Sequence, residues 1–195
     1  MELAQRVRIP VVQSIVWNAL NDPAILKDCL PGCQSFDRTG ENSFEVVLVA
    51  KVGPVKATFK GEVTLNDVIP PDSYRISGSG KGGVAGFAKG GAEVHLESIE
   101  GSAVTLMSYQ VTASVGGKLA QIGSRLVTGA AKKMANDFFK GFVRSLSGDP
   151  SMEVEIENLV LDKSVLDKSV LDKSVLDKGV SGKDADKQGL QPQQG

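Results

Sequence analysis

The stretch Val55-Lys-Ala-Thr-Phe-Lys-Gly-Glu-Val-Thr-Leu65 alternates apolar or small residues with polar ones along its whole length. Successive side chains of a β-strand point to opposite faces, so this period of two predicts an antiparallel strand with one buried face. Gly53-Pro54 predicts a tight turn before it, and residues 43–52 continue the same alternation on the other side of that turn. An antiparallel sheet is therefore expected.

Further elements can be placed on either side of this hairpin. Asn21-Asp-Pro23 separates two short apolar helices, with Asp22 as the N-cap and Pro23 at the first helical position of the second. Period-two segments and turn residues predict the other strands. These strands are expected at residues 3–10, 33–38, 74–80, 92–99 and 103–115. The order predicts an α+β fold with a curved sheet of about seven strands and two short helices after the first strand.

After Gly116-Gly117 the apolar period changes to three and four, which predicts one amphipathic helix of about thirty residues that lies against the sheet. Its apolar stripe comprises Leu119, Ile122, Leu126, Val127, Ala130, Met134, Phe138, Phe142 and Leu146. Its other side carries Lys118, Arg125, Lys132, Lys133, Lys140 and Arg144. This basic side is either a solvated face or a face for an anionic membrane surface.

The chain is predicted to divide into a domain at residues 1–146 and a tail at residues 147–195. The first part carries 16 Lys and Arg against 13 Asp and Glu, and the second carries 6 against 10, so a mildly basic domain precedes an acidic tail. The tail repeats Val-Leu-Asp-Lys-Ser from residue 160, with a period of five that aligns its apolar pairs on neither a helix nor a strand. We expect a disordered tether, and a short solenoid is the alternative.

Composition limits the kinds of protein that the chain can be. The N-terminus alternates like a strand instead of reading as a signal peptide, and no apolar run reaches the roughly 20 residues that cross a bilayer, which predicts a soluble cytoplasmic protein. Cys29 and Cys33 are expected to form neither a disulfide nor a metal site. Aromatic residues make up only 5% of the chain and do not alternate with basic ones, so nucleic-acid binding is not expected.

The segment Gly80-Lys-Gly-Gly-Val-Ala-Gly-Phe-Ala-Lys-Gly-Gly91 is glycine-rich, and Gly78 to Gly83 formally matches a dinucleotide fingerprint. Such a fingerprint must open a helix that receives the pyrophosphate, whereas this segment leads into another strand. We therefore interpret it as a mobile loop with Phe87 as an apolar, lid-like contact at its tip.

No set of residues suggests catalysis. His95 is the only histidine, and the alternation places it with Glu93 and Glu97 on the outer face of its strand. A hydrolase or cyclase would need inward polar side chains, and the strands offer only scattered candidates, namely Tyr74, Ser108 and Gln110. We predict no catalytic residue and no metal site.

Five segments carry a resemblance to a known family. They are Leu20-Asn-Asp-Pro23, Cys29-Leu-Pro-Gly-Cys33, Val52-Gly-Pro-Val-Lys-Ala-Thr-Phe-Lys-Gly61, Gly80-Lys-Gly-Gly-Val-Ala-Gly-Phe-Ala-Lys-Gly90 and Val115-Gly-Gly-Lys-Leu-Ala-Gln-Ile-Gly-Ser-Arg-Leu126. With the order of elements, they resemble the START-like (SRPBCC) helix-grip domains, and within them the CoxG family of carbon monoxide dehydrogenase subunits. The resemblance covers residues 1 to about 146.

This resemblance implies a non-catalytic accessory protein for molybdenum-containing hydroxylases of the carbon monoxide dehydrogenase type. Such proteins are thought to bring the soluble enzyme to the cytoplasmic face of the inner membrane, or to bind a quinone, so the implied location is cytoplasmic and peripheral to that membrane. No covalent cofactor is implied.

Two main hypotheses follow. In the first, a lipophilic small molecule, a quinone or lipid, binds between sheet and long helix against Leu48, Phe59, Phe87, Leu126, Ala130 and Met134. In the second, a recruitment or assembly factor needs no ligand and uses the basic face on anionic lipid and the acidic tail on the enzyme.

Overall fold

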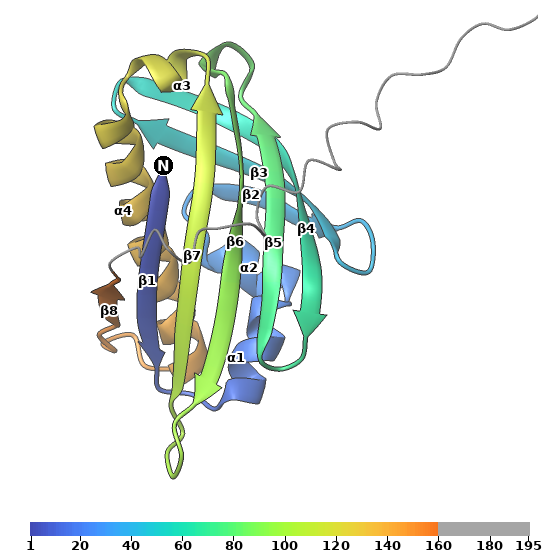
Figure 1. The fold of residues 1–195 in the computed structure, drawn as a ribbon, viewed down its shortest axis with the longest axis vertical. Coiled ribbons are helices and arrows are strands. Elements are labelled where there is room, and N and C mark those ends of the chain that lie inside the picture. The colour runs from blue at the N-terminus through green and yellow to red at the C-terminus, as the bar shows by residue number, and fades with distance from the viewer. Residues whose placement is uncertain (160–195) are drawn as a thin grey trace, which may run out of the picture. The chain divides into compact units, whose positions relative to one another are not determined.

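The computed structural model describes residues 1–159, which form an antiparallel sheet of eight strands with one long helix and several short ones (Figure 1). The strands are β1 (Glu2–Ile9), β2 (Cys33–Arg38), β3 (Ser43–Val52), β4 (Val55–Ile69), β5 (Ser73–Lys81), β6 (Phe87–Ser98), β7 (Thr105–Gly116) and β8 (Glu155–Asn158). The helices are α1 (Gln13–Leu20), α2 (Pro23–Cys29), the 3-10 turn η1 (Gly83–Ala85), α3 (Lys118–Gln121) and α4 (Ser124–Ser147). Among these helices, none has the length and apolar character needed to cross a bilayer.

The sheet has the order β2-β3-β4-β5-β6-β7-β1-β8, and every neighbouring pair is antiparallel. The sheet curves, so that β2 and β3 run across the direction of β5, β6 and β7 (Figure 1). Helix α4 contacts β1, β3 and α2, and thus lies against the concave inner face of the sheet. The predicted helix-grip fold is confirmed, as is the N-cap, where the Ala24 amide donates to the Asp22 carboxylate at 2.8 Å.

The long helix is interrupted near its start. Gly123 has a φ of +91°, in the region that only glycine adopts easily, and this residue separates the single turn of α3 from α4. The apolar stripe continues across the interruption, since Leu119 and Val127 are both buried. The prediction of one uninterrupted helix from residue 119 was therefore wrong at its first turn.

The core is concentrated where α1, α2 and the C-terminal half of α4 pack on the sheet. Phe142 and Val143 have no exposed surface, and Phe138 stacks on Phe142 with ring centroids 5.6 Å apart. On the sheet side, Trp17 packs edge-on against Tyr74 at 5.5 Å. We call this part of the domain the α1 end. The opposite end carries the β3–β4 turn, η1 and α3, which lie together at the top of Figure 1, and we call it the α3 end.

Strand β8 extends the folded domain beyond the predicted boundary at residue 146 and gives the sheet eight strands where about seven were predicted. It pairs with β1, and Glu155 and Glu157 lie 3.9 Å from Arg8 and Arg6. The acidic excess of the predicted tail lies in residues 149–157, which carry four of its acidic groups and no basic one. The remaining residues 160–195, where the disordered tether was predicted, carry six Lys and six Asp and lie outside the described residues.

Strand β8 also satisfies a buried polar group. The Gln5 side chain is 2% exposed, and its Nε2 donates to Asn158 Oδ1 at 3.0 Å and, over a longer distance, to Asn136 Oδ1 at 3.5 Å. A buried donor that loses its partner costs about 1–3 kcal/mol. We therefore expect a chain that ends after Pro150 to unfold with a free energy about 2 kcal/mol lower than a chain that ends after Leu159. Urea titration followed by circular dichroism measures the difference. Equal stability of the two chains would contradict a structural role for β8.

Candidate functional site

The inner face of the sheet at the α3 end is built from unusually small residues. The register pairs Gly61 with Gly80, and Gly78 with both Val63 and Gly90, on the face that further along these strands carries the buried Leu65 and Val94. The small inner residues are Ala50, Ala57, Gly61, Gly78, Gly80, Ala88, Gly90 and Ala113. This part of the inner wall therefore carries few side-chain atoms, whereas large residues line the α1 end. We call this region the glycine-lined hollow.

The same glycines allow the wall to bend. A Cβ at Gly61 would lie 2.7 Å from the Ser79 carbonyl oxygen, and a Cβ at Gly90 would overlap the Thr112 carbonyl oxygen. The neighbouring backbones therefore approach too closely for any side chain at these two positions.

Replacement of Gly90 by alanine is expected to lower the free energy of unfolding by about 1–3 kcal/mol, because the added methyl group must displace backbone. Gly129 is the matched control: it lies inside α4, and a Cβ there meets no atom within 4 Å. Gly129→Ala should raise the free energy of unfolding by about 0.5–1 kcal/mol through helix propensity. Urea unfolding of both variants tests the opposite signs, and a Gly90→Ala protein as stable as the parent would refute the close approach.

The structure places five of the six residues predicted for ligand binding on two elements, the β3–β4 hairpin and α4. Leu48 and Phe59 are directly opposite each other in the register of β3 and β4, and both are half-buried. Ala130 and Met134 are also half-buried and follow Val127 on the α4 stripe that continues to Phe138. Leu126, in the first turn of α4, is 51% exposed, and its Cδ1 would lie 3.6 Å from a Cβ at Gly53 in the β3–β4 turn.

Phe87 does not belong to this set. The register pairs it with Lys81 and Gly116, which places it on the outer face of the sheet together with Lys89. Its ring lies over Gly116, where a side chain would collide with it. The prediction was wrong because the glycine-rich segment is mostly strand: β5 runs to Lys81 and β6 begins at Phe87. Only residues 82–86 leave the sheet.

Sequence reasoning missed two buried polar groups on the inner face, Tyr109 and Gln5, which lie opposite each other in β7 and β1. Tyr109 is 7% exposed, its hydroxyl donates to Gln5 Oε1, and its ring packs on Phe139 at 5.3 Å. Burial raises the pKa of Tyr109, so the phenol stays neutral. Of the polar residues predicted to point inward, Tyr74 does so, whereas Ser108 and Gln110 alternate with the buried Met107 and Tyr109 and therefore face outward.

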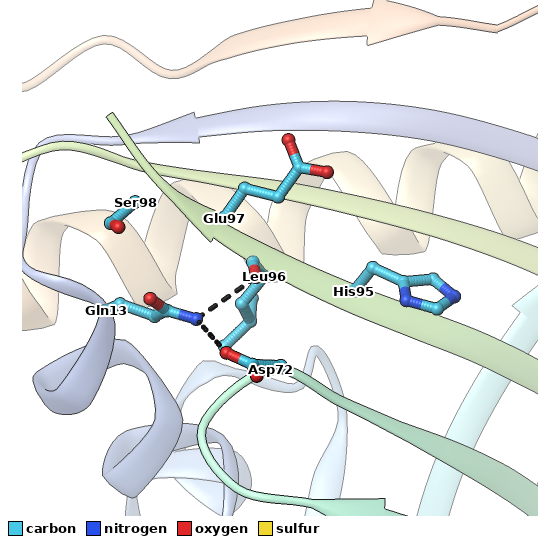
Figure 2. Close-up of a pocket in the computed structure, with 6 residues that line it drawn as sticks. All are labelled: Gln13, Asp72, His95, Leu96, Glu97 and Ser98. Atoms are coloured by element: carbon cyan, nitrogen blue, oxygen red, sulfur yellow. Dashed lines mark hydrogen bonds between the residues drawn. The ribbon is translucent and has the colours of Figure 1, made fainter. Parts of the chain in front are cut away.

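The exposed position predicted for His95 is confirmed. It lies on the rim of a shallow depression of about 440 Å³ that is also lined by Gln13, Asp72, Leu96, Glu97 and Ser98. Figure 2 shows that the imidazole points away from Gln13, whose amide donates to Asp72 Oδ1 at 3.0 Å and to the Leu96 carbonyl at 3.1 Å. These bonds attach α1 to the β4–β5 turn and to β6. Within residues 1–159, no group of three His, Cys, Asp or Glu side chains is placed to hold a metal ion.

Cys29 and Cys33 are free thiols in the structure. Burial raises the pKa of each of them, which keeps them in the less reactive protonated form.

Comparison of folds identifies the class of protein. The structure is similar to a conserved protein from Geobacillus kaustophilus, with 30% sequence identity, a TM-score of 0.71, and coverage of 80% of this chain and 99% of that one. It also resembles the Zhui aromatase/cyclase from a Streptomyces species (10% identity, TM-score 0.54, 75% and 93% covered) and Ara h 8.0201 (14% identity, TM-score 0.52, 76% and 98% covered). The chain thus has the START-like, helix-grip fold.

The family follows from the sequence model that matches. The model of CoxG, a subunit of carbon monoxide dehydrogenase, matches residues 6–147, and the chain belongs to this family. The family supplies accessory proteins of the carbon monoxide dehydrogenase system. None of the curated proteins compared with the chain matches it significantly.

Proposed function

We propose that the protein is a non-catalytic accessory factor that binds a lipophilic molecule, a quinone or lipid, in the glycine-lined hollow. The ligand would lie against Leu48 and Phe59 of the sheet and against Leu126, Ala130 and Met134 of α4. By carrying this ligand, the protein would couple a molybdenum hydroxylase of the carbon monoxide dehydrogenase type to the inner membrane.

The contrast between the two ends of the domain carries the proposal. At the α1 end, aromatic side chains fill the space between α4 and the sheet, and Phe142 and Val143 have no exposed surface. At the α3 end, the sheet presents glycine and alanine, while Leu48, Phe59 and Met134 remain only half-buried and Leu126 is half-exposed. Small-molecule sites are concave and mostly apolar, and a lipophile would bury the apolar surface that this end leaves accessible.

Family membership supports the partner and the role. The family is defined as a subunit of carbon monoxide dehydrogenase, and the Tyr109 hydroxyl on the inner face already donates a hydrogen bond to Gln5. The resemblance to an aromatase/cyclase is at 10% identity and concerns the fold alone.

The direct test is extraction of the purified protein with organic solvent, followed by mass spectrometry. A quinone or lipid in stoichiometric amount is the expected result. In parallel, the delipidated protein should bind cis-parinaric acid with increased fluorescence, and menadione should displace it. If the protein yields no lipophile and binds neither probe, the second hypothesis is favoured, namely a recruitment factor that needs no ligand.

A further inference from the structure

Lysines gather on the outer face of the sheet at the α3 end. In the register, Lys60 lies directly opposite Lys81, and Lys51 lies directly opposite Lys56. Lys89 is on the same face in β6, across from Ser79 and Ser114. We call this group the outer lysine cluster: Lys51, Lys56, Lys60, Lys81 and Lys89.

These lysines have no charge partner in the described part of the chain. The ion pairs within 4.0 Å there involve Arg6, Arg8, Arg75 and Lys133, and none of the cluster. Arg75 in particular, on the same strand as Lys81 but nearer the α1 end, is held by Asp67 at 3.0 Å and Glu93 at 3.3 Å. Like charges directly opposite each other destabilise a sheet, so the two opposed lysine pairs are expected to cost stability.

An exposed apolar tip adjoins the cluster. The η1 turn connects Lys81 to the start of β6, and Val84 within it is 84% exposed. Phe87, on the same outer face as Lys81 and Lys89, is 46% exposed. Leu126, beside the β3–β4 turn at the same end, is 51% exposed. Exposed apolar side chains next to unpaired lysines suit a lipid bilayer, whose anionic headgroups contact the lysines and whose acyl chains bury the apolar groups. An acidic protein surface would pair with the lysines but would not bury Val84.

We propose that the protein docks on an anionic bilayer through the α3 end, with Val84 inserted and the outer lysine cluster on the lipid phosphates. This orientation places the glycine-lined hollow next to the membrane, where a lipophile enters or leaves, and to that extent the inference rests on the proposed function. The docking face is then the outer face of the sheet at the α3 end. The sequence pattern had suggested the basic side of α4 instead. On α4, Lys133 is already paired with Asp137.

Co-sedimentation of the full chain with vesicles tests this assignment. Vesicles of phosphatidylcholine alone are compared with vesicles that also contain phosphatidylglycerol, at low and high salt. Substitution K60Q/K81Q/K89Q is expected to reduce partitioning onto the anionic vesicles on the order of 100-fold, at about five-fold per lysine. The matched control K132Q/K140Q/R144Q removes the same charge from the exposed side of α4. It should change partitioning onto the anionic vesicles by less than about three-fold. Val84→Ser should reduce binding about ten-fold by removing the inserted side chain.

The inference is overturned if wild-type protein fails to sediment with anionic vesicles, which would favour an acidic protein as the partner of the cluster. It is equally overturned if the α4 control loses as much binding as the cluster variant. Binding of cis-parinaric acid is measured on the same proteins in the absence of vesicles. Wild-type protein that binds the probe but does not sediment with anionic vesicles refutes the docking face alone, and wild-type protein that sediments without binding the probe refutes the proposed function alone.

Discussion

Ala57→Phe is expected to weaken binding of a lipophile by at least about ten-fold. Ala57 lies on the inner face of β4, opposite Ala50 and two residues from Phe59, so a phenyl group there occupies space that the ligand would use. A ligand that loses roughly 60–100 Å² of apolar contact loses about 1.5–2.5 kcal/mol at about 25 cal/mol per Å², which corresponds to about ten- to seventy-fold in affinity. Displacement of cis-parinaric acid by menadione measures the change.

Thr58→Phe provides the matched control. Thr58 is the next residue in β4, faces outward and is exposed, so the same aromatic group is added without entering the hollow. We expect an affinity within about two-fold of the parent, since the free energy of binding should change by less than about 0.5 kcal/mol. If both variants bind as the parent does, the ligand is not bound in the glycine-lined hollow. If both lose binding equally, a general effect on the strand explains the result.

Phe142→Ala should have the largest effect on stability. Phe142 has no exposed surface and stacks on Phe138 at the α1 end. Truncation of a buried phenylalanine leaves a cavity and costs about 3–5 kcal/mol, which is a large share of the 5–15 kcal/mol that typically stabilises a domain. Urea unfolding should show a lower midpoint with an unchanged slope.

Leu126→Ala is the control on the same helix. Leu126 is 51% exposed, so its truncation should cost less than about 1 kcal/mol while weakening binding of the lipophile. A loss of stability as large as that of Phe142→Ala would mean that α4 is packed equally along its length. Together the two variants distinguish the C-terminal half of α4, which stabilises the fold, from its first turns, which we propose contact the ligand.

Much of this architecture could be predicted because β4 and α4 have strong periods. The alternation from Val55 to Leu65 determines which residues share a face, and Leu48 and Phe59 were therefore placed together correctly. Phe87 was misplaced because glycine and alanine around it give no apolar period. Without that period, its face depends on where β6 begins, and β6 begins at Phe87 itself, as the pairing with β5 shows.

The last strand escaped prediction for a different physical reason. Glu155 to Asn158 is four residues long and half acidic, and a short charged segment has little intrinsic tendency to form a strand. Its partners are Arg6 and Arg8, about 150 residues earlier in the chain, together with the buried amide of Gln5. Pairing between residues so far apart leaves no local pattern in the sequence. The acidic residues were therefore assigned to the tail.

The glycines of the inner wall limit which residues of the proposed ligand site could change to alter its specificity. At Gly61 and Gly90, a larger residue would change the bend of two strands before it changed the volume available to a guest. Ala130 and Met134, on the helix opposite, can be exchanged for larger or smaller side chains without disturbing any strand pairing. Adaptation to a lipophile with a wider ring or a longer acyl chain would therefore change residues of α4. The glycines of the inner wall would be retained for any ligand.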